Sequence, residues 1–202
     1  AFKARGATNA VWCLDDAVAS RGVATHSSGN HGAALALAAA ERGIPAWVVV
    51  PDNAAGVKRD AIARYGARIV ECRPGMAARE AGLSRVVEET GASVIHPYDD
   101  HRVIAGQGTA ALELLDDEPD MDLLLCPVGG GGLIAGDEFE RNRLRSGLHC
   151  AVTVPGRHAE RQNRAIDSEQ PQQVVVPVER VTIEKQCSRC VGRVAHRHRA
   201  RA

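Results

Sequence analysis

Short apolar runs alternate with longer segments of helical composition over residues 23–136. The run Ile44–Val50 is apolar at almost every position and lies between a glycine and a proline, as expected of a strand buried on both faces. Before it comes an Ala- and Leu-rich segment, Asn30–Arg42, for which Gly43 is a suitable helix stop. We predict further helices over 54–65, 76–90 and 104–115, and strands over 67–72, 93–96 and 121–128.

This alternation predicts an α/β fold, with open parallel sheets and helices on both faces. In such sheets ligands bind where strands end and helices begin. Two glycine-containing segments fall at these points: Ser27–Gly32 before the first predicted helix, and Gly129–Gly132 after the last predicted strand. We therefore expect the functional site to form around these two segments.

Composition excludes several classes of protein. The 202 residues carry 25 basic and 25 acidic side chains, so no net charge attracts the chain to nucleic acid or to a membrane surface. No apolar run has the length of a membrane span. The six cysteines are scattered, which favours reduced thiols and a cytoplasmic location. Because the chain has no initiator Met, we expect a fragment or a processed product.

The candidate chemistry begins with Lys3, whose amine can condense with an aldehyde to form a Schiff base. An isolated lysine near a chain end is usually only a surface residue. The segment Ser27–Gly32 can offer backbone N–H groups to an anion, although Ser and Asn also cap helices without further function. The glycine run Gly129–Gly132 follows an apolar strand and precedes a helix start, which is the arrangement of an anion-binding loop. It lacks the lysine and hydroxyl residue of a nucleotide P-loop.

These segments together carry a family resemblance. Phe2-Lys3-Ala4-Arg5-Gly6-Ala7, Ser27-Ser28-Gly29-Asn30-His31-Gly32 and Pro127-Val128-Gly129-Gly130-Gly131-Gly132 occur in the order found in the fold-type II (tryptophan synthase β-like) enzymes that use pyridoxal 5′-phosphate (PLP). The chain most resembles the group that contains serine racemase and the serine/threonine dehydratases. The resemblance covers about residues 2–136, and the tail is unmatched.

The resemblance implies a role for each motif. Lys3 would hold PLP as an internal aldimine and act as general base, and Ser28 would be the acid/base on the opposite face. The implied cofactor-binding residues are Phe2, Lys3, Asn30, Gly129, Gly130, Gly131 and Gly132. The implied substrate-binding residues are Ser27, Ser28, Gly29, Asn30 and His31.

The implied function is a dehydratase (ammonia-lyase), a racemase or both, acting on L-serine, L-threonine or a related 3-hydroxy amino acid such as 3-hydroxyaspartate. The alternative is a catalytically inactive fragment of such an enzyme. The family implies a small amino-acid substrate and a homodimer for the intact protein. A divalent cation is possible in the family, but the sequence offers no residues for its site.

The resemblance also implies a domain division. Residues 1–22 and 101–150 would belong to the large PLP-binding domain, residues 23–100 would form a small α/β domain, and residues 151–202 a divergent, partly disordered tail. Residues 138–202 hold 13 of the 25 basic but only 7 of the 25 acidic residues, and their periodicity fades. We expect the chain to lack the family segment before Lys3, and the tail to be frameshifted or genuinely divergent. Sequencing the encoding DNA tests the frameshift, since no family-like reading in any frame would contradict it.

Other motifs carry weaker expectations. Tyr65 lines the approach to the site or is a buried residue at a helix end, and Gly106 and Gly108 serve helix packing rather than ligand contact. Cys187 and Cys190 with His196 and His198 have some zinc-ligand character, but their spacing is unlike that of regular structural zinc sites. We therefore predict no metal site.

Overall fold

The computed structural model describes residues 2–121, 123–137 and 149–153 of the chain. The tail beyond 153, with Cys187, Cys190, His196 and His198, lies outside the described residues. A further helix begins at Gly132, and twelve elements have both ends in the described part. They are α1 (Phe2–Trp12), α2 (Asp16–Ala19), β1 (Val23–His26), α3 (Asn30–Arg42), β2 (Ala46–Pro51), α4 (Gly56–Arg64), β3 (Arg68–Cys72), α5 (Met76–Thr90), β4 (Ser93–Val94), α6 (His101–Asp117), β5 (Leu123–Pro127) and β6 (His149–Thr153).

The strands form two parallel sheets. The first has the order β3-β2-β1-β4, and every neighbouring pair in it is parallel. In the second, β5 pairs in parallel with β6, a strand that the sequence pattern did not predict. The predicted α/β class with open parallel sheets is therefore confirmed. In the described part of the chain, no helix has the length and apolar character needed to cross a membrane.

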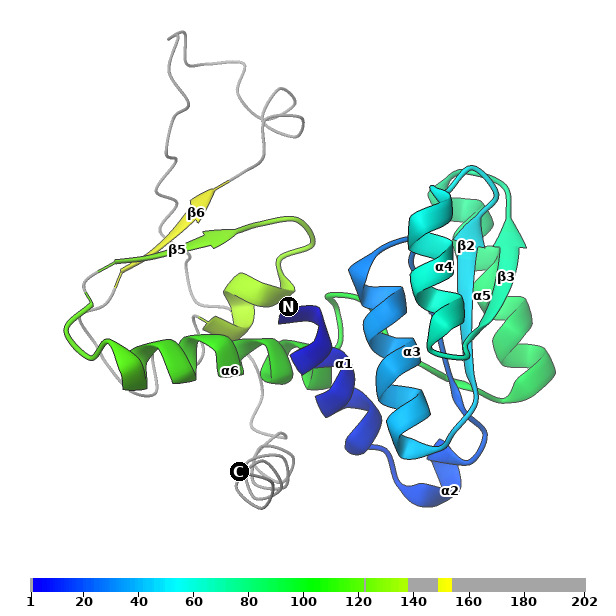
Figure 1. Ribbon diagram of the computed structural model, residues 1–202, viewed down its shortest axis with the longest axis horizontal. Helices are drawn as coiled ribbons and strands as arrows, with labels where there is room; N and C mark the ends of the chain where they lie inside the picture. The colour runs from blue at the N-terminus through cyan, green and yellow to red at the C-terminus, as the bar shows by residue number, and fades with distance from the viewer. Residues whose placement is uncertain (1, 122, 138–148, 154–202) are drawn as a thin grey trace, which may run out of the picture.

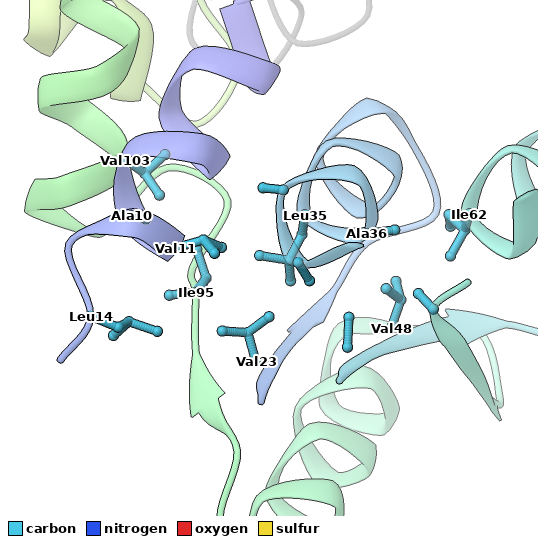
Figure 2. Packing of buried hydrophobic residues seen from close by; sticks show 14 of the residues in the cluster. Ala10, Val11, Leu14, Val23, Leu35, Ala36, Val48, Ile62, Ile95 and Val103 are labelled. Atoms are coloured by element: carbon cyan, nitrogen blue, oxygen red, sulfur yellow. The ribbon is translucent and has the colours of Figure 1, made fainter. Parts of the chain in front are cut away.

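Helices cover both faces of the four-stranded sheet (Figure 1). Successive residues of a strand point to opposite faces, so Val48 and Val50 of β2 belong to one core cluster and Val49 to another. The first cluster includes Leu35 of α3 and Ile62 of α4 (Figure 2). In the second, Val49 packs with the buried Leu83 and Val86 of α5. Since each fully buried Val or Leu side chain is worth ~1.5–3 kcal/mol, these two layers hold the sheet between its helices.

Helix α1 joins the sheet layer to α6. Ala10 and Val11 of α1 are fully buried in the same cluster as Leu35 and as Val103 of α6 (Figure 2). The helices α1 and α6 approach closely where Gly6 of α1 faces Gly106 of α6. A Cβ on Gly106 would lie only 2.6 Å from the carbonyl oxygen of Arg5. The domain division at residues 22/23 and 100/101 stays a prediction.

Glycines end two helices where the sequence indicated. Helix α3 spans Asn30–Arg42 and α5 spans Met76–Thr90, and the following residues, Gly43 and Gly91, have φ angles of 71° and 69°. This left-handed conformation suits glycine, which lacks a Cβ. Both helices agree with their predicted bounds.

At two of the boundaries that differ from the prediction, side chains of the connecting segment bind its backbone. Strand β4 ends at Val94 rather than at His96, since the His96 Nδ1 accepts the N–H of Asp99 at 2.9 Å and turns the chain. Helix α6 begins at His101, three residues before the predicted start, because the Asp100 side chain caps it by accepting the N–H of Arg102 at 2.9 Å.

Candidate active site

The carboxyl end of β1 is the centre of the site. The strand ends at His26, the loop 27–29 follows, and α3 begins at Asn30. Beside it, the segment after β4 continues along β1, because the Ile95 N–H donates to the Ala24 carbonyl at 2.9 Å. The segment 95–98 therefore lies next to the loop that the sequence singled out, and it organises the rest of the site.

Lys3 reaches this segment from α1. Its Nζ donates a hydrogen bond to the carbonyl oxygen of Pro97 at 2.5 Å, and it lies 5.0 Å from the centroid of the Phe2 ring. The side chain is half-buried, and this burial lowers the pKa of the Lys3 amine. A lowered pKa raises the fraction of neutral amine at a given pH, and the neutral amine is the nucleophilic form.

The loop before α3 is compact. The Gly29 N–H donates to Ser27 Oγ at 3.3 Å, and a Cβ on Gly32 would lie 2.8 Å from the Ser27 carbonyl oxygen. Ser28 is half-buried and Asn30 is exposed. No described heavy atom lies within 4 Å of the Cβ position of Gly29, so the helix start faces open space. The geometry suits an anion at the N-terminus of α3.

His31 is the buried member of the same loop. Its Nε2 lies 3.1 Å from the Ile95 carbonyl, which can only accept a hydrogen bond, so Nε2 carries the proton. Burial lowers the pKa of His31 to about 4, with Lys3 and the rings of His96 and His26 adding to the effect, while the hydrogen bond to Ile95 opposes it. His31 is therefore neutral near pH 7, and its Nδ1 is a buried acceptor that no described residue satisfies.

A row of rings lines the segment beside the loop. The His26 and His96 rings lie 5.7 Å apart edge to face, and the His96 and Tyr98 rings lie 4.6 Å apart in the same manner. Burial lowers the pKa of His26, and His96 and Arg79 lower it further, while Glu80 opposes them. Within the described residues, no three His, Cys, Asp or Glu side chains come together to hold a metal ion.

The glycine run lies against Tyr98. A Cβ on Gly130 would collide with the Tyr98 ring, and a Cβ on Gly132 would lie 2.8 Å from the Tyr98 carbonyl oxygen. Gly131 has a φ of 85°, and residues 132–137 continue as a helix in which the Ala135 N–H donates to the Gly131 carbonyl at 3.0 Å. Around the Cβ positions of Gly129 and Gly131 no described atom lies within 4 Å. One side of the run is thus packed and the other is open.

The structure brings part of each of the three motifs to one segment. Lys3 contacts Pro97, His31 contacts Ile95, and the glycine run contacts Tyr98. The functional roles given to these residues, and to Ser28 and Asn30 at the start of α3, stay predictions. The sequence did not identify the segment 95–98 as part of the site. Its only signal was that it lies at the end of the strand predicted over 93–96.

Two weaker expectations are resolved. Gly106 and Gly108 serve helix packing, as predicted: Gly108 faces Gly136, whose carbonyl oxygen lies 2.6 Å from the Gly108 Cβ position. Both expectations for Tyr65 are wrong, because the residue is 38% exposed and follows α4 just before the start of β3. The start of a parallel strand is the edge of the sheet opposite the site.

Comparison with known proteins agrees with this geometry. The family model described as "Pyridoxal-phosphate dependent enzyme" matches residues 1–186, which extends beyond the motifs ending near residue 136. The chain belongs to this family. The expected fold-type II resemblance is confirmed, and family membership implies PLP as cofactor.

Two relatives and one solved structure show how much of the PLP enzymes is matched. The chain is 54% identical over 136 residues to the β-hydroxyaspartate dehydratase of Paracoccus denitrificans, covering 67% of this chain and 43% of that protein. It is 52% identical over 155 residues to the serine racemase of Oryza sativa subsp. indica, covering 77% and 46%. The structure of maize serine racemase superposes with a TM-score of 0.77 at 39% identity, covering 88% of this chain and 53% of that one. The chain spans about half the length of the curated relatives it matches.

The described residues fit PLP chemically. A PLP enzyme needs an accessible amine of lowered pKa, which Lys3 provides, and donors for a phosphate, which the open side of Gly129–Gly132 provides. The two meet at neighbouring residues, Pro97 and Tyr98. The amine and the glycine run thus lie against one dipeptide, and their roles in holding the cofactor stay predictions.

Proposed function

We propose that the intact protein is a PLP-dependent dehydratase, racemase or both, acting on L-serine, L-threonine or a related 3-hydroxy amino acid. One observation carries this proposal: the Lys3 amine and the glycine run contact adjacent residues, Pro97 and Tyr98, at the carboxyl end of the parallel sheet. The resemblance to serine racemases and to a hydroxyaspartate dehydratase supports the same reaction class.

In this proposal Lys3 binds the cofactor through its amine, beside Phe2. The backbone N–H groups of Gly129–Gly132 bind the phosphate, and the Asn30 side chain orients the ring. When bound, PLP supplies an electron sink for the charge that develops at the substrate α-carbon. The site orients the bond that is to break against this sink, and the half-buried setting of Lys3 limits access of water.

The substrate carboxylate would bind at the start of α3. Ser27, Ser28, Gly29, Asn30 and His31 would hold it there, where the helix N-terminus favours negative charge. The neutral state of His31 keeps its Nε2–H committed to Ile95, so the loop is held in place by a bond to the neighbouring segment.

Proton transfer would then involve two residues on opposite faces. Lys3 would take the proton from the substrate α-carbon as a general base, a role that suits an amine whose pKa is lowered by burial. Return of a proton to the α-carbon by Ser28 from the other face gives the D-amino acid. Loss of the β-hydroxyl instead gives, after hydrolysis, a 2-oxo acid and ammonia.

The test is to incubate the protein with PLP, reduce with borohydride and map the modified peptide. The expected product is a PLP adduct on Lys3 that is absent from Lys3→Ala and retained in Lys58→Ala, since Lys58 is exposed on α4. Labelling of Lys58 with Lys3 unmodified would refute the proposal. An adduct on Lys3 without any formation of 2-oxo acid or D-amino acid would favour the alternative, a catalytically inactive fragment.

Arg79 favours one candidate substrate, 3-hydroxyaspartate. Its Nε is buried with no hydrogen-bond partner among the described residues, and its charge lowers the pKa of His26 at the carboxyl end of β1. A guanidinium there is suited to a second carboxylate. Arg79→Gln should then lower kcat/KM for 3-hydroxyaspartate more than for serine. An equal loss for both substrates would remove this candidate.

We also propose that the intact protein is a cytoplasmic homodimer, as the family resemblance implies. Sedimentation analysis of the intact protein tests the dimer, and a monomer at all concentrations would contradict it.

A further inference from the structure

Gln107 on α6 is buried, and no described residue forms a hydrogen bond with its side-chain amide. Its side chain has 0% exposure, and neither Oε1 nor Nε2 has a hydrogen-bond partner among the described residues. Leaving such a group unsatisfied costs ~1–3 kcal/mol, and native proteins seldom do so without a functional reason. The two unsatisfied atoms therefore call for a ligand or a conformational role.

The surroundings of Gln107 fix where its amide points. Its Cγ lies 2.9 Å from the Cβ position of Gly6 on α1, and its Oε1 lies 3.2 Å from the Cβ position of Gly132. The Gln107 side chain thus lies against α1, the helix that carries Lys3, and its amide ends beside Gly132, the last residue of the glycine run. Gly132 is also where the helix over 132–137 begins.

Two glycine contacts prevent Gln107 from turning to solvent. Its neighbour Gly106 packs on the Arg5 carbonyl, and its other neighbour Gly108 packs on Gly136, each at 2.6 Å from the Cβ position to the oxygen. Residue 107 is held between α1 and the helix that follows the glycine run. The amide is therefore preorganised rather than free to find another partner.

We infer that Gln107 is a positioning residue for the anion site at Gly129–Gly132. When a phosphate group binds the open side of the run, the Gln107 carbonyl oxygen, which faces Gly132, accepts a backbone N–H of the anion-loaded loop and holds the start of the helix over 132–137 in place. This inference rests on the proposed function, because it takes the glycine run to be a phosphate site.

Substitution of Gln107 is expected to weaken phosphate binding without lowering stability. Gln107→Leu removes two unsatisfied polar atoms at similar shape, so the free protein should be at least as resistant to urea as the wild type. The same change should weaken binding of inorganic phosphate about tenfold or more, because the loop that binds the anion loses the hydrogen bond that holds it in place. A residue with only a packing role would behave in the opposite way.

Asn9 provides the matched control. It is also a buried amide at the α1–α6 contact, 4% exposed, but its Nδ2 donates to the Arg102 carbonyl at 2.7 Å. Asn9→Leu should therefore lower stability and leave phosphate affinity unchanged. Gln107→Met, which keeps an unbranched side chain, gives a second variant should Gln107→Leu fold poorly.

The experiment measures inorganic phosphate affinity by calorimetry and stability by urea denaturation, on the full chain and its variants. Weaker phosphate binding with unreduced stability in Gln107→Leu or Gln107→Met supports the inference. Unchanged phosphate affinity in both variants, or no phosphate binding by the wild type, overturns it. If the inference is overturned but the wild type still gives the borohydride-trapped adduct on Lys3, only the role of Gln107 is refuted. If the wild type does not give that adduct, the proposed function itself is refuted.

Discussion

The Nζ of Lys3 donates a hydrogen bond to the carbonyl oxygen of Pro97, 94 residues further along the chain. The next residue, Tyr98, supports the glycine run, so one dipeptide contacts both the amine and the anion loop. The site therefore depends on a short segment of irregular backbone rather than on a helix or a strand.

The first prediction concerns the pH dependence of Lys3. Burial lowers the pKa of this amine, so its neutral form is present at lower pH in the folded protein than in the unfolded chain. The rate of PLP attachment to Lys3 should rise at a lower pH in buffer than in concentrated urea. Peptide mapping after borohydride reduction measures both profiles. Coincident profiles would show that Lys3 is not desolvated.

The second prediction concerns the packed side of the glycine run. Gly130→Ala should destabilise the protein by about 1–3 kcal/mol, because the added methyl group collides with the Tyr98 ring. Urea denaturation measures the loss. Gly56→Ala is the control, since no atom lies within 4 Å of its Cβ position and its φ is not positive. If Tyr98→Ala does not relieve the defect of Gly130→Ala, the collision is not its cause.

The third prediction concerns Asp137, which is 4% exposed and accepts a hydrogen bond from Cys126 Sγ at 3.4 Å. Burial raises the pKa of Asp137 from 3.8 to about 6, although the bond from Cys126 opposes this. The folded protein thus binds this proton more tightly than the unfolded chain does. Its contribution to stability is complete below about pH 4 and is lost as the pH rises through about 6.

Asp137→Asn should consequently stabilise the protein near pH 7 and lose that advantage near pH 4. The expected gain is about 1–2 kcal/mol after allowance for solvent screening. Urea denaturation of both proteins at the two pH values gives the difference. A gain of equal size at both pH values would show that titration of Asp137 is not its source.

The fourth prediction concerns Arg42, whose side chain is only 9% exposed. Its guanidinium donates to the Val11 and Leu14 carbonyls at the end of α1, the latter at 2.8 Å. Arg42→Met should lower the free energy of unfolding by about 1–3 kcal/mol, because these carbonyl groups lose their donors. Arg42→Lys should restore little, since one ammonium group does not reproduce the planar fork.

The control for Arg42 is Arg85→Met on α5. Arg85 is exposed and forms only a 4.0 Å ion pair with Glu89, which is worth less than about 0.5 kcal/mol. Equal losses in the two variants would contradict the capping role of Arg42. Urea denaturation again provides the measurement.

Local signals explain why parts of the fold were predictable. The bounds of α3 and α5 follow from helix-forming composition ended by Gly43 and Gly91, whose left-handed conformation is a property of one residue. The parallel class followed from alternation of strands and helices along the chain. In the site, the three motifs each carried a sequence signal, and the structure brings them to one end of the sheet.

Tertiary contacts explain what was missed. Tyr98 and Gln107 have no distinctive local pattern, and their relation to the glycine run arises only when α6 and the run pack together. Tyr65 was misplaced although the alternation of parallel strands and helices already puts the end of each crossover helix at the edge of the sheet opposite the strand carboxyl ends. Strand β6 owes its existence to pairing with β5, for which the sequence around it offered little alternation.

The contact between Lys3 and Pro97 can form only some time after Lys3 has been synthesised. Lys3 leaves the ribosome 94 residues before Pro97, and at 5–20 residues per second about 5 to 20 s pass before Pro97 is made. During that interval the Lys3 amine is solvated, and burial does not yet lower its pKa. The burial that lowers the pKa of the Lys3 amine can therefore be completed only after Pro97 has been made.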